Sequence, residues 1–232
     1  MISKPFELQK HLDKKIFLFY GENSGQKDEI ISQFFKKNHK NCTYNYSEKE
    51  ILSNLDNFYD QINSRSFFDE KKLIIINSVS DKFREEIYNL KKNNYNDITI
   101  ILISGTLEKK SKLRGIFEKE KKLIIVPFYR DENRSLSEIA RMFFNKRKIL
   151  VSQETINIIC QKSSGDRRNL NNELEKIENF LGSNKKLKFD DTLKLINLSE
   201  NYSIKDLVNN CLAKNKRKTF KIINENIFVL ED

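Results

Sequence analysis

The stretch that decides the fold is "FLFYGENSGQKDEIISQF", residues 17–34. It places an apolar segment before a glycine turn, a lysine and a helical pattern, which is the order found around the phosphate-binding loop of many ATPases. That motif requires a glycine, four further residues and then Gly-Lys-Ser/Thr. Counted from Gly21, the last three places are held by Gln26, Lys27 and Asp28. The lysine is therefore in register, whereas both of its neighbours depart from the motif.

These departures affect the chemistry of the loop. The motif glycine lets backbone amides point at a phosphate, and the Ser/Thr hydroxyl binds Mg²⁺. Gln26 brings a side chain into this tight turn, and Asp28 puts an anion where phosphate oxygens would lie. Gly25 lies one place too early to restore the register. We therefore expect Gly21, Gly25 and Lys27 to form a degenerate phosphate loop that does not bind ATP productively, and we expect no cofactor.

A second, independent feature supports this expectation. ATP hydrolysis in this class of protein also uses an acidic residue that holds the metal ion at the end of a strand. The corresponding apolar run, "KKLIIINSVSD" (residues 71–81), ends in the neutral Asn77. Two defects in one site make ATP turnover improbable.

Outward from the loop, residues 1–132 alternate short apolar runs with amphipathic stretches. Strands that are almost wholly apolar and separated by helices are typical of a parallel sheet covered on both faces. The pattern predicts a three-layer α/β domain in residues 1–132. The five expected strands are residues 16–20, 42–46, 73–76, 98–104 and 123–126. Pro127 is expected to end the last of them, because proline cannot donate to a strand ladder.

The strand signals stop after a polar linker, "FYRDENRS" (residues 128–135). We expect a small helical domain in residues 133–198, with Ser152 as a helix N-cap and Gly182 as a helix stop. Two further amphipathic segments, 204–212 and 220–228, follow. Two lone helices cannot enclose a core. Residues 199–232 are therefore expected to be the start of an incomplete helical domain, in a chain that is cut short.

Composition excludes several classes of protein. The content of 38% hydrophobic and 33% charged residues is typical of a globular protein, and the apolar runs are too short to span a bilayer. Without an apolar secretory leader we expect a cytoplasmic protein with no membrane partner. Three scattered cysteines (Cys42, Cys160 and Cys211) and two isolated histidines predict neither a disulfide framework nor a metal site.

The formal net charge of +10 is compatible with nucleic-acid binding, because basic residues near phosphates gain affinity by counterion release. Lys, Asn and Ile are abundant throughout the chain, however, so much of this charge is expected on solvated faces. Two other classes stay open at this point. One is an active ATPase of DNA replication, which would need the intact motif, and the other is a non-enzymatic basic DNA-binding protein, which only the charge supports.

Five segments carry a further signal through their order and spacing, and these are "FLFYGENSGQKDEI" (17–30), "SRSFFDEKKLIIIN" (64–77), "ILISGTLEKKSKLRGIFEK" (101–119), "SSGDRRNLNNELEKI" (163–177) and "SIKDLVNNCLAKNKRKTFKIIN" (203–224). Together they resemble one family, the delta subunit of bacterial DNA polymerase III, which has an AAA+-like fold. The match extends across nearly the whole chain. Family members are about a hundred residues longer, on the scale of one additional domain, so the resemblance implies that most of the C-terminal collar is missing here.

The resemblance implies a clamp-loader subunit that binds and opens the ring-shaped sliding clamp for loading onto DNA, without ATP hydrolysis of its own. It implies that Phe67 and Phe68 contact the clamp. Taken alone, this aromatic pair in "NSRSFFDEKK" (residues 63–72) has the composition of a surface anchor, but the sequence by itself favours a cap on the core of the sheet; only the resemblance favours the anchor, at least for Phe68. The implied partners are the clamp (beta subunit) and, where a collar is available, the delta prime and tau/gamma subunits.

The same resemblance also bears on two basic features of the sequence. A basic run follows the fourth strand, where clamp-loader modules often face DNA, and implies non-specific contact with the DNA backbone. Arg167 and Arg168 lie where an ATPase relative would sense nucleotide, and we expect them to pair with Glu173, Glu175 or a neighbour. The basic run consists of Lys109, Lys110, Lys112 and Arg114.

Overall fold

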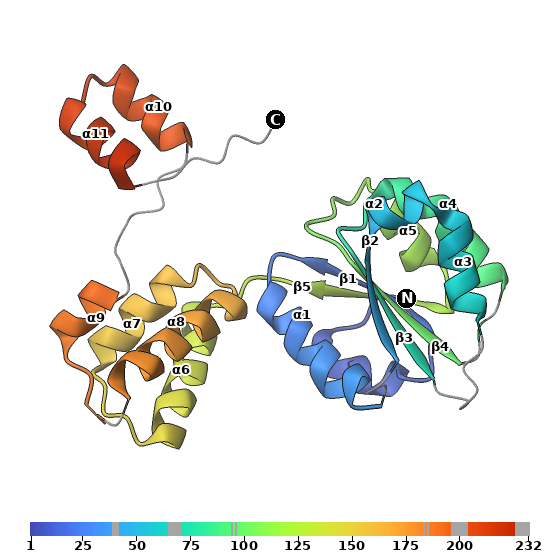
Figure 1. Cartoon of the computed structure of the whole chain (residues 1–232), viewed down its shortest axis with the longest axis horizontal. Coiled ribbons are helices and arrows are strands. Elements are labelled where there is room, and N and C mark those ends of the chain that lie inside the picture. Colours follow the sequence, from blue (N-terminus) through green and yellow to red (C-terminus); the bar gives the residue numbers. More distant parts are fainter. Residues whose placement is uncertain are drawn as a thin grey trace.

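The computed structural model describes residues 1–38, 42–64, 71–93, 95, 97–182, 184, 186–195 and 204–225. Its centre is a five-stranded, all-parallel sheet in the order β2-β3-β4-β1-β5 (Figure 1). All five predicted strands are confirmed, with ends that differ by one or two residues. The strands are β1 (Ile16–Gly21), β2 (Thr43–Ser47), β3 (Lys72–Asn77), β4 (Ile98–Ile103) and β5 (Leu123–Phe128).

Helices cover both faces of this sheet, which confirms the three-layer prediction. On one face, Leu18 and Ile100 belong to a core shared with four α-helices. On the other, Phe17 and Phe19 pack against Phe35 and the first helix. Figure 1 shows α1 on one side of the sheet and α2 to α5 on the other. The helices are α1 (Ser24–Ile30, continued by the π-helical segment Ile31–Phe35), α2 (Glu48–Ser53), α3 (Leu55–Asn63), α4 (Arg84–Lys92) and α5 (Lys112–Lys119).

The prediction that Pro127 ends the last strand is wrong. Strand β5 runs through Pro127, which is paired with Tyr20, and ends at the fully buried Phe128. The reason is the position of β5 at the edge of the sheet, because an edge strand has one side on which a missing N–H breaks no ladder bond. The polar connection between the sheet and the helices that follow it (residues 133–195, called the helical part below) is therefore shorter than the sequence indicates.

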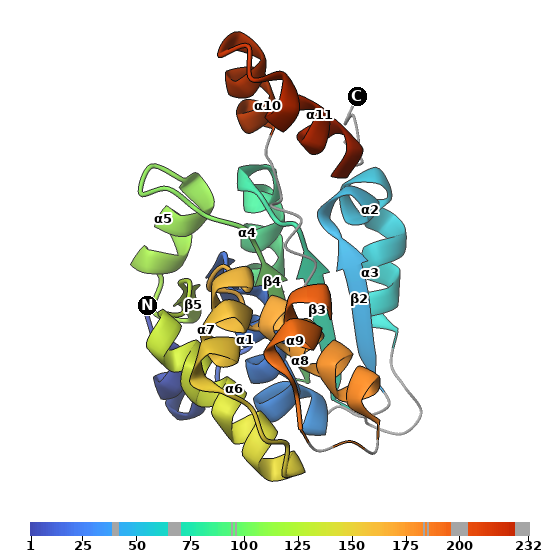
Figure 2. The ribbon, with the colours of Figure 1, turned by 90° about the vertical axis from the view of Figure 1, so that its left-hand side faces the viewer.

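A separate core joins the helices that follow the sheet. Leu136, Phe144, Leu170 and Leu174 are all buried within it. The predicted N-cap is confirmed, because the Ser152 side chain accepts from the amide of Thr155. Gly182 ends a helix with φ of 51°, also as predicted. Figure 2 shows these helices grouped beside α1, and they are α6 (Asn133–Arg147), α7 (Gln153–Lys162), α8 (Arg167–Leu181) and α9 (Phe189–Leu195).

Two further helices, α10 (Ile204–Leu212) and α11 (Lys216–Glu225), pack against each other. Helix α10 has the predicted bounds, whereas α11 begins four residues before its predicted start. Residues 226–228, the predicted end of that segment, lie outside the described residues. Ile222 is fully buried, while Leu212 and Phe220 are exposed. Among the described helices, none is both long and apolar enough to cross a membrane.

Candidate functional site

The name β1–α1 loop is used for residues 21–27, which include the last residue of β1 and the first turn of α1. This loop lies at the carboxyl end of β1, between β4 and β5. Gly21 has φ of 122°, and a Cβ there would lie 2.1 Å from the carbonyl oxygen of Phe128. Only glycine tolerates both this backbone conformation and the close approach of β5. Asn23 caps helix α1 by accepting from the amide of Gln26 at 3.2 Å. The predicted order of strand, glycine turn and helix is confirmed.

Lys27 points into the protein. Its side chain is almost fully buried, and its Nζ donates to the carbonyl oxygens of Gly21 at 2.6 Å and Ser104 at 2.8 Å. Burial lowers the pKa of Lys27, while the nearby carboxylates of Asp166 and Asp28 oppose this shift. The ammonium group therefore joins the ends of β1 and β4.

An open cleft of about 470 Å³ lies at the carboxyl ends of the strands beside this loop. Two arginines that line it already have carboxylate partners, because Arg130 pairs with Glu22 and Arg168 donates to Asp28. Asn77 ends β3 as predicted and also lines the cleft. Its side-chain amide donates to a backbone carbonyl of β2 at 3.3 Å. This strand end offers a neutral amide where an ATPase would hold a metal with a carboxylate.

The amides at the start of α1 bind a carboxylate from the helical part of the chain. Asp166, the N-cap residue of α8, accepts from the amide of Gly25 at 2.9 Å. It also accepts from the amide of Ser24 at 3.2 Å. The same amide donates to the carbonyl oxygen of Glu22 at 3.0 Å. Amides at such a position are what an intact phosphate loop offers to a phosphate.

Asn23 connects three parts of the chain through one fully buried side chain. Its Nδ2 donates to the carbonyl of Tyr129 at 3.1 Å and to Asp131 at 2.7 Å, both in the segment that leads to α6. Its Oδ1 accepts from the amide of Arg167 at the start of α8 at 3.2 Å. This residue, which the sequence analysis did not single out, thus joins loop, connecting segment and helical part.

Of the partners expected for Arg167 and Arg168, which were Glu173, Glu175 or a neighbour, the two glutamates are wrong. Glu173 pairs with the neighbouring Lys176, at 2.6 Å. Both arginines instead point across to the sheet domain, because they start α8 beside the β1–α1 loop.

Arg167 makes the more enclosed of the two sets of contacts. Its guanidinium donates to both oxygens of Asp131, at 2.7 and 3.1 Å, and to Glu29 of α1 at 2.7 Å. The hydrogen bond to Asp131 is the largest cause of a raised pKa for Arg167. Arg168 donates to Asp28 at 2.9 Å, in a more exposed position.

Gly25 lies where helix α8 comes closest to the β1–α1 loop. A Cβ at this position would lie 2.0 Å from the amide nitrogen of Arg168 and 2.5 Å from the carbonyl carbon of Arg167. A side chain there would push α8 away, so the glycine allows the helical part to reach the loop. The sequence shows the glycine, but the helix that it accommodates is about 140 residues away, and no local pattern could indicate that contact.

The structure describes only some of the other predicted site residues, and these differ in exposure. Phe67 and Phe68 lie outside the described residues. In the basic run, Lys109 and Lys110 are exposed, and Lys110 pairs with Glu108. Arg114 is mostly covered, because it donates to Glu118 at 2.7 Å and lies over the ring of Tyr20. It is thus less available for DNA than Lys109 and Lys110 are, while Lys112 begins α5.

Replacing Lys27 by methionine should destabilise the protein in the absence of any nucleotide. The change leaves the carbonyls of Gly21 and Ser104 without their buried donor, which costs about 1–3 kcal/mol. Thermal unfolding with and without MgATP measures this, with the exposed Lys109→Met variant as control. Stabilisation of the wild type by MgATP, absent in Lys27→Met, would contradict the structural role and indicate a nucleotide-binding lysine.

Comparison with known proteins places this geometry in context. No family model matches the chain. A curated protein of Rickettsia prowazekii (strain Madrid E), "Probable DNA polymerase III subunit delta", is 24% identical over 177 residues. The match covers 76% of this chain and 54% of that protein, so the chain spans about half the length of this relative.

Solved structures share the fold at low identity. The Thermotoga maritima RuvB Holliday junction branch migration motor matches with a TM-score of 0.59 and 13% identity, over 91% of this chain and 72% of that one. Domain III of the Thermotoga maritima replication initiation protein DnaA matches with a TM-score of 0.51 and 13% identity, over 83% and 88%. The Bacillus subtilis DNA clamp loader delta protein aligns over 95% of this chain and 70% of that one, at 14% identity and a TM-score of 0.49. The chain shares the expected AAA+-like fold with these structures, and its sequence is similar to that of a curated, probable DNA polymerase III delta subunit.

Proposed function

We propose that this chain acts as a clamp-loader delta subunit, which binds the ring-shaped sliding clamp and opens it for loading onto DNA during replication. The similarity to a curated delta subunit supports the clamp-loader role. The β1–α1 loop supports the absence of ATP hydrolysis, because the chain's own groups already occupy it. In this role the chain is a non-catalytic part of the DNA polymerase III holoenzyme.

The occupied loop is the observation that carries the non-catalytic part of the proposal. A nucleotide phosphate at this loop would have to displace Asp166 from the amide of Gly25. It would also meet the carboxylates of Asp28 and Asp166, while the ammonium of Lys27 is held by two carbonyls. Like charges in close proximity oppose such binding, so the loop disfavours ATP for reasons beyond its sequence departures.

Clamp opening would require no chemistry from this subunit. A partner that binds the open clamp more tightly than the closed one shifts the equilibrium of the clamp by the ratio of the two affinities. The proposed contact is the pair Phe67 and Phe68, with ATP use left to neighbouring subunits. Delta prime and tau/gamma subunits are the proposed further partners, in the cytoplasm.

Equilibrium binding to the cognate sliding clamp tests the proposal directly. The dissociation constant should be the same with and without MgATP, and the purified chain should release no phosphate from ATP. Binding that requires ATP, or hydrolysis that is lost in Lys27→Ala, would instead favour an active ATPase. Failure of the folded chain to bind the clamp at all would reject the delta-subunit role for this chain.

Contact with the DNA backbone is a second, separable proposal. Lys112 of the basic run lines an open groove between α4 and α5, together with Arg84, Tyr88, Lys119 and the acidic Glu85 and Glu120. Each neutralised phosphate contributes about one unit to the salt slope of binding. Charge reversal of Lys109, Lys110 and Lys112 together should make the slope of log affinity against log salt shallower by about two to three units. Reversal of Lys146 and Lys148 in the helical part is the control, and an equal slope in all three proteins would reject this surface.

A further inference from the structure

We propose that Asp166 holds the helical part against the β1–α1 loop in place of a nucleotide phosphate, so that the two parts keep one relative position with or without ATP. This inference concerns the arrangement of the chain itself and does not depend on clamp binding. It starts from the amides at the beginning of α1, which have no partner within their own helix.

The contact of Asp166 with the loop is specific in its geometry. One carboxylate oxygen accepts from the amides of both Gly25, at 2.9 Å, and Arg168, at 2.7 Å. The other oxygen accepts from the amide of Ser24 at 3.2 Å. The same carboxylate therefore caps α8 and satisfies the start of α1. Because it is covalently part of α8, satisfying the loop amides also fixes the position of that helix.

Ion pairs beside this contact also hold the helical part against the sheet domain. Arg167 joins α8 both to Asp131 in the connecting segment and to Glu29 in α1. Arg168 joins α8 to Asp28, also in α1. These pairs span about 36 to 140 residues of sequence, so each one restrains the helical part relative to the sheet.

Backbone contacts leave little space between the two parts. The amide of Asp131 donates to the carbonyl of Gly165 at 2.8 Å, which ties the connecting segment to the turn before α8. The close approach of α8 to Gly25 places the helix start directly on the loop. A bound phosphate would have to move α8 away, whereas the chain as it stands satisfies the loop with its own carboxylate.

The test uses Asp166→Ser in the full chain. Serine keeps an N-cap oxygen for α8 but is too short to reach the loop amides as well, so α8 is expected to remain folded. Glu175→Ser is the matched control, because Glu175 is an exposed carboxylate on the same helix. Circular dichroism establishes that both variants retain their helices.

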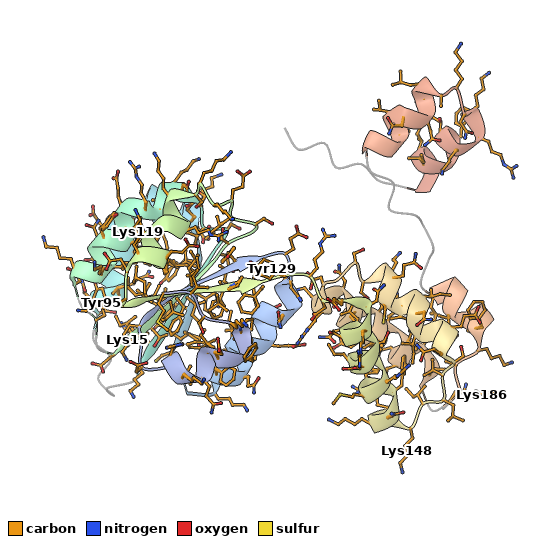
Figure 3. All side chains as sticks on the ribbon, turned by 180° about the vertical axis from the view of Figure 1, so that it is seen from behind. Lys15, Tyr95, Lys119, Tyr129, Lys148 and Lys186 are labelled. Atoms are coloured by element: carbon orange, nitrogen blue, oxygen red, sulfur yellow. The ribbon has the colours of Figure 1, made fainter. Side chains whose placement is uncertain are left out.

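Two readouts report on the contact. The first is hydrogen exchange of the Gly25 amide, which should become about tenfold faster or more in Asp166→Ser, since it loses a charge-assisted acceptor. The second is the distribution of distances between spin labels at Lys119→Cys in α5 and Lys146→Cys in α6, in a Cys211→Ser background. Figure 3 labels Lys119 in the sheet domain and Lys148, two residues beyond Lys146, at the lower end of the helical part.

The wild type and Glu175→Ser should give one narrow distribution that MgATP does not change, and Asp166→Ser should give a broader one. The proposal is overturned if folded Asp166→Ser retains the wild-type exchange rate and distance distribution. It is also overturned if MgATP shifts the distribution of the wild type. Neither readout involves the clamp, so a failure of the proposed clamp binding would leave this result interpretable.

Discussion

Replacing Phe67 and Phe68 together by alanine should weaken binding to the sliding clamp by at least about 100-fold, because a buried aromatic anchor typically contributes 2 kcal/mol or more. Two large aromatics bracketed by polar and charged residues have the composition of an anchor that inserts into a partner. The effect should appear mainly as faster dissociation, since truncation of an anchor removes contacts that form after the encounter. Surface-immobilised clamp, without nucleotide, gives both rates.

A matched control separates this contact from general loss of surface hydrophobicity. Among the described residues, Phe6 and Phe180 are aromatics with 74% and 53% exposure, one in the sheet domain and one in the helical part. The double variant Phe6→Ala/Phe180→Ala should bind the clamp as the wild type does. If both double variants retain full affinity while the wild type binds, the aromatic pair is not the anchor and another surface must carry the contact.

The sheet could be predicted from the sequence because each strand carries its own signal. Runs such as Leu73–Ile76 are short, apolar throughout and mostly β-branched, which only a strand buried on both faces explains well. The one error, at Pro127, arose because the rule against proline applies to central strands. The sequence does not state which strand lies at the edge.

The loop was predictable in part for a similar reason. Its departures from the phosphate-binding motif are local, so residues 21–28 suffice to indicate them. What fills the loop is not local, because Asp166 and the loop amides are about 140 residues apart. An Asp before a helix predicts an N-cap, and the second contact of the same carboxylate leaves no trace in the neighbouring sequence.

For Arg167 and Arg168, too, the local sequence could not indicate the partners. The expectation named Glu173 and Glu175 on the same helix, but these lie five to eight residues from the arginines, whereas neighbours on a helix are three or four apart. Such reasoning omits partners that a different element brings closer. Here α1 and the connecting segment offer three carboxylates at the start of α8, and the arginines bind those.

These adjacent arginines should differ strongly when each is replaced by alanine. Arg167 and its partner Asp131 are 21% and 11% exposed, whereas Arg168 and Asp28 are 55% and 51% exposed. Removing Arg167 leaves Asp131 largely buried with Asn23 as a remaining donor, and should cost about 2–4 kcal/mol, somewhat below the value for a fully buried pair. Removing Arg168 should cost about 0–1 kcal/mol, as for exposed ion pairs.

Urea unfolding followed by circular dichroism at neutral pH measures this difference, with Arg168→Ala serving as the matched control for Arg167→Ala. Adding Asp131→Asn to Arg167→Ala should recover part of the lost stability, because it removes the charge that has lost its partner. Equal and small effects of the two single variants would show that the Arg167–Asp131 pair is solvated in the protein. In that case the position of the helical part would depend on Asp166, the contacts of Asn23 and the packing at Gly25 rather than on this ion pair, and the broader distance distribution should still appear in Asp166→Ser.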